Sequence, residues 1–118
     1  GVNLLRGRVV DAGTVRLASG VDLAVADAEP AAGTAVVAIV HPRAVALYST
    51  RPDGSPRNVW SARVVAIDDE GARARVQLAG PVPLVAEITR AAAQELDVRT
   101  GVELWYSVKA SEVVVAAE

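Results

Sequence analysis

An internal repeat constrains the fold of this 118-residue chain more than any other feature of its sequence. Residues 3–10 (NLLRGRVV) align with residues 58–65 (NVWSARVV), so each half opens with an Asn followed by a largely apolar segment. Further along, the aligned pairs are Leu17 and Leu78, Leu23 and Leu84, Gly33 and Gly101, and residues 40–43 and 108–111. The offset between the copies grows along the chain, which predicts a longer first hairpin and an additional element in the second copy.

Both copies are dominated by the sequence pattern of short β-strands. Residues 14–17 and 21–25 alternate between apolar and polar side chains, and residues 35–40 form a continuous apolar run. The apolar residues are mostly Val, Ala and Leu, and a core rich in β-branched Val suits strands. A barrel closes its own edges, which a small open sheet cannot do. We therefore predict an all-β fold of two tandem five-stranded barrels, with residues 1–50 in the first lobe and residues 51–118 in the second.

One segment of the second copy departs from the strand pattern. Residues 89–96 (TRAAAQEL) are rich in residues that favour helices, and Thr89 is of a type that caps helix N-termini. Eight residues form about two turns, so tertiary packing must hold this helix in place. Residues 68–71 (DDEG) are typical of a hairpin tip. One short helix is thus expected in an otherwise all-β chain.

The composition argues against several classes of function. The absence of Cys excludes disulfides, thiolate metal sites and a Cys nucleophile, and a net charge of −2 gives no basic field for nucleic acid. The single His41 precedes Pro42, and no Ser lies beside a base, so we expect no catalysis by this chain. The acidic residues lack the spacing of a calcium loop, so neither a metal nor another cofactor is predicted. No apolar run approaches the ~18 residues of a membrane span, and no signal peptide pattern is present.

Hydrogen-bond donors gather in two turns of the second half. Ser55, Arg57 and Asn58 lie between the halves, and residues 109–111 (KAS) follow a predicted strand. Thr89 adds a hydroxyl at the start of the predicted helix. A tetrahedral dianion such as molybdate or sulfate only accepts hydrogen bonds, so a set of donors without a carboxylate favours such an anion over partly protonated phosphate. The alternatives are a linker that carries an Arg and a solvated Lys at a strand end.

Three segments together resemble the Mop, or TOBE, domain, an OB-like molybdate-binding unit: residues 55–58 (SPRN), 86–89 (AEIT) and 108–111 (VKAS). The resemblance runs from about residue 52 to residue 116, and the first half fits the companion barrel more loosely. It implies that two chains commonly contribute to one site and that the OB-like barrels pair across subunits. The residues that it implies for the oxyanion site are Ser55, Arg57, Thr89, Lys109, Ser111 and the backbone N–H of Ala110, with Asn58 fixing the turn.

The order and spacing of these segments are similar to those of the C-terminal regulatory domain of the ATP-binding subunit of bacterial molybdate importers. This resemblance implies a ligand, molybdate or tungstate, and no cofactor. It implies an ATPase domain on the N-terminal side, an indirect partnership with a membrane permease, a homodimer or larger homo-oligomer, and a cytoplasmic location at the inner face of the membrane. The chain begins with Gly1 and has no Met, so we expect a fragment or a processed chain.

Some positions depart from the pattern of the family. Ala92 stands where several relatives have a Ser, and His41-Pro42-Arg43 stands in the first half where the second has Lys-Ala-Ser. We therefore expect the first lobe not to bind an oxyanion in the same way. Glu112 follows the Lys-Ala-Ser segment directly, and alternation along a strand is expected to turn it away from the side that Ser111 faces.

Three functions compete on this evidence. The first is a sensor of cytoplasmic oxyanion that regulates transport, and the second is a structural dimerisation module of an importer for sugars or other solutes. The third is an oligonucleotide-binding barrel, which needs aromatic stacking and a basic groove. Trp105 and Tyr106 are consecutive and are expected to face opposite sides of a strand, and the net charge is negative, so no nucleic acid partner is predicted.

Overall fold

The computed structural model describes residues 1–54 and 58–118, and nearly all of the regular structure in these ranges is strand. The helical elements there are α1 (Arg90–Glu95) and two 3₁₀ turns, η1 (Pro42–Ala44) and η2 (Ala110–Glu112). The strands are β1 (Asn3–Asp11), β2 (Thr14–Leu17), β3 (Asp22–Ala24), β4 (Ala35–Val40), β5 (Ala46–Tyr48), β6 (Asn58–Glu70), β7 (Arg73–Ala79), β8 (Leu84–Thr89), β9 (Glu103–Val108) and β10 (Val114–Ala117). The predicted all-β class with one short helix is confirmed.

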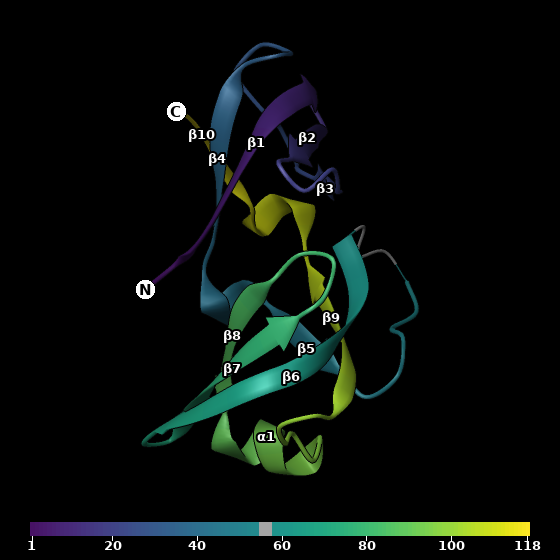
Figure 1. Cartoon of the computed structure of the whole chain (residues 1–118), viewed down its shortest axis with the longest axis vertical. Coiled ribbons are helices and arrows are strands. Elements are labelled where there is room, and N and C mark those ends of the chain that lie inside the picture. Colours follow the sequence, from purple (N-terminus) through teal and green to yellow (C-terminus); the bar gives the residue numbers. More distant parts are fainter. Residues whose placement is uncertain (55–57) are drawn as a thin grey trace.

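The strands form two five-stranded antiparallel sheets that exchange one strand each. The first sheet has the order β10-β4-β1-β2-β3, and the second has the order β5-β9-β6-β7-β8 (Figure 1). Strand β5 comes from the first half of the sequence but pairs with β9, and β10 comes from the end of the chain but pairs with β4. The division into residues 1–50 and 51–118 therefore does not coincide with the division into sheets. The chain crosses between the sheets immediately after η1 and again after η2.

The sequence repeat corresponds to a repeat of strand register. A bulge interrupts the pairing of β1 with β2 just after Val9, and a bulge interrupts the pairing of β6 with β7 just after Val64. Gly33 and Gly101 adopt the same left-handed backbone, with φ of 88° and 92°. In the first sheet Val9 pairs with Val15, which in turn pairs with Leu23. In the second sheet Val64 pairs with Leu78, which in turn pairs with Leu84. These two sets of residues are therefore equivalent. The alignment of Leu17 with Leu78 was therefore wrong by two residues, because the paired residues Val15 and Leu23 are eight positions apart whereas Leu78 and Leu84 are six apart.

The longer hairpin and the extra helix of the second half are both present. Strands β6 and β7 extend to Glu70 and Arg73, well beyond the bulge, and Gly71 forms the turn with φ of 68°. The hairpin tip was predicted at residues 68–71. Asp68 to Glu70 still belong to β6, so the tip begins only at Gly71. Thr89 caps α1 as predicted, because its Oγ1 accepts a hydrogen bond from the N–H of Ala92 at 3.1 Å.

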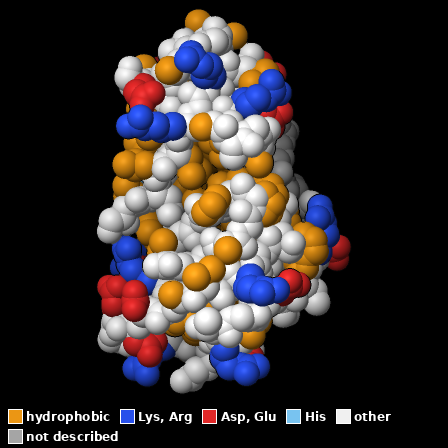
Figure 2. All heavy atoms as spheres, in the orientation of Figure 1, with side chains coloured by type: hydrophobic (Ala, Val, Ile, Leu, Met, Phe, Trp, Pro, Cys, Tyr) orange, Lys and Arg blue, Asp and Glu red, His pale blue; other side chains and the backbone are white. Residues whose placement is uncertain are grey.

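One hydrophobic core joins the two sheets. It consists largely of Val, Leu and Ala from both halves, and Tyr106 is its largest fully buried side chain. The Tyr106 hydroxyl donates to the carbonyl of Val82 at 2.6 Å and accepts from its N–H at 3.2 Å, so this polar group is satisfied inside the core. On the face shown in Figure 2, charged side chains gather toward both ends and hydrophobic side chains are visible between them. Within the described ranges, no helix is long and apolar enough to cross a membrane.

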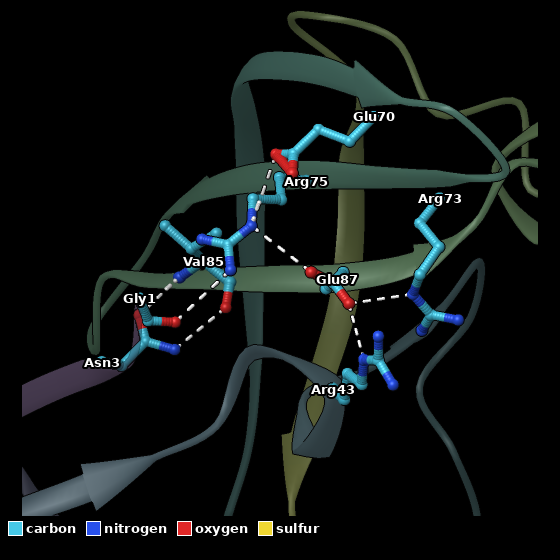
Figure 3. Close-up of polar contacts among 8 residues, drawn as sticks. All are labelled: Gly1, Asn3, Arg43, Glu70, Arg73, Arg75, Val85 and Glu87. Carbon is cyan, nitrogen blue, oxygen red and sulfur yellow. Dashed lines mark hydrogen bonds and ion pairs between the residues drawn. The ribbon is translucent and has the colours of Figure 1, made fainter.

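Two equivalent asparagines connect the halves. The amide of Asn58 at the start of β6 donates to the carbonyl of Ala24 and accepts from its N–H, both at 2.8 Å. The amide of Asn3 at the start of β1 makes the same pair of bonds with Val85, at 2.9 and 2.8 Å (Figure 3). Asn58 thus hydrogen-bonds to β3 and Asn3 to β8, and each of these is an edge strand of the other sheet. The sequence repeat is therefore also a repeat of contacts between the two sheets.

Candidate functional site

A cleft of about 950 Å³ lies where the chain crosses between the sheets, and we call it the central cleft. Both 3₁₀ turns contribute to its wall, as do β5 and the segment that follows β3. The lining residues used below are Ala26, His41, Arg43, Tyr48, Asp53, Lys109, Ala110, Ser111 and Glu112. Sequence reasoning placed Lys109 to Ser111 at a site, and the structure puts these three residues on one wall of the central cleft.

The turn η2 presents donors to this wall. The first hydrogen bonds of the turn are donated by Glu112 to the carbonyl of Lys109 and by Val113 to the carbonyl of Ala110. The N–H groups of Ala110 and Ser111 precede these bonds, as the first amides of a helical turn do, and they make no hydrogen bond with another described residue. The side chains of Lys109 and Ser111 are exposed, so an ammonium, a hydroxyl and two amides are available to a ligand.

Glu112 corrects an expectation from the sequence. Alternation along a strand was expected to turn it away from Ser111, but residues 110–112 form a 3₁₀ turn, and Glu112 lines the same cleft as Ser111. Asp53 lies on the cleft wall as well. The wall is therefore not made of donors alone, and the two carboxylates oppose the attraction of Lys109 for an anion.

The turn η1 occupies the equivalent place in the first half but offers fewer donors. Pro42 stands where η2 has Ala110, and proline has no N–H. Arg43 stands where η2 has Ser111, and its Nε donates to the Glu87 carboxylate at 2.6 Å. The predicted difference between the halves thus has a structural counterpart, since one amide is missing and the guanidinium is already paired.

Of the other described candidates, Asn58 lies near η2 but is already engaged, and Thr89 lies far from η2. Asn58 is 1% exposed and its amide is fully used by Ala24, so it acts as a structural clamp. Thr89 pairs with Arg73 at the hairpin end of the second sheet, whereas Val108 pairs with Asn58 at the other end (Figure 1). Ser55 and Arg57 lie outside the described residues. Among the predicted residues that the structure describes, those that line the central cleft together are Lys109, Ala110 and Ser111.

A second polar cluster, which we call the Glu87 cluster, consists of Glu87, Arg43, Arg73 and Arg75. Glu87 Oε2 accepts from Arg43 Nε at 2.6 Å and from Arg73 Nε at 2.8 Å, and Arg75 Nε lies 3.4 Å from Oε1 (Figure 3). The Glu87 side chain is only 13% exposed. The hydrogen bond from Arg43 is the main cause that lowers its pKa below the ordinary value, although desolvation acts in the opposite direction.

Sequence reasoning missed the Glu87 cluster because Arg43 lies 44 residues from Glu87. Part of it was accessible, since Arg73 and Arg75 alternate along one strand and point to the same face. Placing residue 87 opposite residue 75 would have required the register of β7 with β8. The register of β7 with β8 depends on the longer β6–β7 hairpin, and the strand pairing of that hairpin could not be derived from the sequence.

Two other functional readings receive no support from the geometry. In the described part of the chain, no group of three or more His, Asp or Glu side chains is placed to hold a metal ion. Tyr106 is fully buried, and the ring of Trp105 is partly exposed and lies 5.1 Å from the Arg51 guanidinium. The two rings therefore do not form one stacking platform, as expected from their consecutive positions.

Three known proteins that are similar to this chain have names that refer to molybdenum or molybdate. The TOBE domain family matches residues 54–115. The chain is 38% identical over 118 residues to the molybdenum import ATP-binding protein ModC of Mycobacterium tuberculosis, which covers 96% of this chain and 32% of that protein. It is 37% identical over 75 residues to the molybdate/tungstate import ATP-binding protein WtpC of Pyrococcus horikoshii, covering 63% of this chain and 22% of that protein. The chain thus spans a third or less of the length of these relatives.

A solved structure matches almost the whole chain. The cytoplasmic molybdate-binding protein ModG, in a crystal form with molybdate bound, superposes with a TM-score of 0.85 at 27% identity. The match covers 98% of this chain and 96% of that one. Together with the two curled five-stranded sheets, the match confirms the predicted all-β, OB-like fold class, while the closure of each sheet into one of two tandem barrels stays a prediction.

Proposed function

This chain belongs to the TOBE domain family, and we propose that it binds molybdate or tungstate and does not itself catalyse a reaction. The observation that carries the proposal is the turn η2, in which Lys109, Ala110 and Ser111 line the central cleft and the amides of Ala110 and Ser111 make no hydrogen bond with another described residue. A tetrahedral dianion accepts at all four oxygens, and hydrogen bonds to a charged group contribute about 1.5–3 kcal/mol each. The similarity to ModG, ModC and WtpC supports the choice of this anion.

A second copy of the chain completes the site in this proposal. Thr89 lies at the far end of the second sheet from Lys109, so one chain cannot direct both side chains at one small anion. In a homodimer with a two-fold axis, each site takes Lys109, Ala110 and Ser111 from one copy. The partner copy supplies Thr89, and Ser55 and Arg57 complete the donor set from either copy. Asn58 contributes indirectly, by holding the start of β6 against Ala24.

The proposed setting is an importer for oxyanions. The chain corresponds to about a third of ModC, whose printed name describes an ATP-binding import protein, so we place it as a regulatory domain beside an ATPase domain on the cytoplasmic side of the membrane. Anion binding between two such domains would alter the transport cycle only if the site has different affinity in different states of the ATPase pair. The transporter would thereby respond to the cytoplasmic concentration of molybdate.

Calorimetry tests the binding step. Molybdate and tungstate are expected to bind the isolated chain with micromolar or lower Kd, and sulfate and phosphate serve as control anions. Lys109→Ala is expected to weaken molybdate binding at least tenfold, while Arg16→Ala, which removes a positive charge outside the central cleft, leaves the affinity within about twofold. Heat from none of the anions would reject the proposal and leave a dimerisation module as the function of the domain.

A further inference from the structure

The two halves offer equivalent positions beside their 3₁₀ turns, and these positions are filled differently. The clamps of Asn58 on Ala24 and of Asn3 on Val85 fix the equivalence of β3 with β8. Two residues beyond each clamped residue stand Ala26 and Glu87. Ala26 faces the central cleft that η2 also lines, and Glu87 contacts Arg43 of η1.

At the η1 position, one carboxylate is surrounded by three guanidinium groups. Arg43 comes from η1, and Arg73 and Arg75 come from β7 (Figure 3). Glu70 is 3.5 Å from Arg75, so it offsets charge at the rim without entering the centre of the Glu87 cluster. A carboxylate that accepts bonds from several guanidiniums is in the place that a free oxyanion would take among the same donors.

At the η2 position, the described residues include no counterpart of Glu87, Arg73 or Arg75, although Glu112 and Asp53 lie on the cleft wall. Ala26 ends in a methyl group, and Ser111 stands where η1 has Arg43. Arg73 and Arg75 belong to the extension of the β6–β7 hairpin beyond the bulge, and the β1–β2 hairpin has no such extension. The central cleft beside η2 is consequently open, whereas the equivalent place beside η1 holds a charged side chain.

We propose that Glu87 is a built-in anion that occupies the first-half counterpart of the oxyanion site. The presence or absence of a carboxylate at the equivalent positions 26 and 87 then determines which of the two places accepts an anion from solution. The statement about position 26 rests on the proposed function, whereas the statement about position 87 rests on the Glu87 cluster alone. Glu87 thereby sets the number of oxyanions that each chain binds.

The test removes the built-in anion in a chain whose proposed site has been disabled. Lys109→Ala is expected to weaken molybdate binding at least tenfold, and the double variant Lys109→Ala/Glu87→Ala is expected to regain binding of one equivalent of molybdate per chain. The guanidiniums of Arg43, Arg73 and Arg75 are partly exposed, so water can solvate them once Glu87 is replaced, and both variants are expected to fold. Circular dichroism and thermal melting verify this. Glu87→Ser in the same background is the second variant, because its small side chain also vacates the centre of the cluster.

Two controls separate a specific place from bulk charge. Glu70→Ala removes one negative charge from the same surroundings but leaves Glu87 in place, so it is expected to bring no new equivalent of molybdate. Adding Arg43→Ala to the Glu87→Ala variant is expected to weaken the new binding at least tenfold. No new binding in either Glu87 variant would overturn the proposal, and so would an equal gain in Glu70→Ala.

The reciprocal substitution distinguishes this proposal from the proposed function. Ala26→Glu places a carboxylate in the central cleft and is expected to weaken molybdate binding by the unmodified η2 at least tenfold, with sulfate and phosphate as control anions. If the unmodified chain binds no molybdate, the proposed function fails, yet the gain in the Glu87 variants is still expected. If Ala26→Glu leaves strong binding unchanged, the equivalence of the two positions is overturned.

Discussion

The turns η1 and η2 have the same backbone and opposite chemical roles. Each begins with an extended residue, His41 with φ −67° and ψ 138° or Lys109 with φ −66° and ψ 139°, and each leads into a strand that joins the other sheet. In η1 the next residue is Pro42, and Arg43 pairs with Glu87 of β8. In η2 the next residue is Ala110, and Ser111 is exposed beside the central cleft. A repeated backbone therefore does not imply repeated chemistry, and in our proposal a few side chains decide whether an anion is bound or built in.

The largest expected effect concerns the two clamps, Asn58 on Ala24 and Asn3 on Val85, which make the same pair of hydrogen bonds but are buried to different extents. Asn58 is 1% exposed, and Asn58→Ala both removes this buried side chain and leaves the N–H and carbonyl of Ala24 without their partners, so we expect it to reduce the free energy of unfolding by about 3 kcal/mol. Asn3→Ala exposes the same groups of Val85 to partial solvation and is expected to cost about 1–2 kcal/mol. Urea unfolding measures both, and an equal or reversed order would break the comparison.

A smaller effect is expected where the second half has a feature that the first lacks. Tyr106→Phe removes the hydroxyl that satisfies both backbone groups of buried Val82, and we expect a loss of about 2 kcal/mol in the free energy of unfolding. The equivalent residue of β4 is Ala38, which has no polar group to satisfy. The control is Tyr48→Phe, whose hydroxyl contacts the Ser107 hydroxyl in a less buried place and is expected to cost less than 1 kcal/mol. A loss for Tyr48→Phe that exceeds that for Tyr106→Phe would contradict the account.

Glu112 should modulate affinity more weakly than Lys109 does. Its carboxylate lines the cleft wall beside the donors, so Glu112→Gln removes a repulsion and is expected to tighten molybdate binding about two- to fivefold. Glu29→Gln carries the same change of charge outside the central cleft and is expected to change the affinity much less. Calorimetry at two salt concentrations checks both variants, with the gain expected to shrink as salt rises. Weaker binding by Glu112→Gln would show that the carboxylate supports the site.

The smallest expected effect is a dependence of stability on pH from the Glu87 cluster. The guanidinium of Arg43 lowers the pKa of Glu87 below its ordinary value of 4.5. The cluster therefore contributes stability that is fully present above pH 4.5 and is lost as the pH falls through the lowered pKa of the folded state. Wild type is expected to lose more stability between pH 7 and pH 3 than Glu87→Gln does, as measured by urea unfolding. Parallel curves for the two proteins would indicate that Arg43 gives the carboxylate no preference for its charged form.

Much of the fold could be predicted from the sequence because its signals are local. Alternating Val and Leu predicted the strands, and Thr89 followed by Ala-rich residues predicted the capped helix. The exchange of β5 and β10 could not be predicted, since three- and four-residue strands carry no information about which sheet they join. The shift between Leu17 and Leu78 has the same origin, because hairpin register depends on the turn and on pairing across strands.

The site was predictable only in part, for a related reason. The donors of η2 are consecutive in the sequence, so Lys109 to Ser111 could be recognised together. The 3₁₀ turn that brings Glu112 to the same cleft depends on where β9 ends, and a strand was assumed there instead. The pairing of Arg43 with Glu87 depends on packing of η1 against β8, which no spacing in the sequence reveals.

The most direct test of the difference between η1 and η2 is a titration of the ¹⁵N-labelled chain with molybdate, followed by amide chemical shifts. We expect large, saturable shifts for the amides of Ala110 and Ser111 at one end of the central cleft. The amides of Arg43 and Ala44 in η1 are expected to move little, because Glu87 already holds the Arg43 guanidinium. Equal shifts at both turns, or shifts confined to η1, would contradict the account.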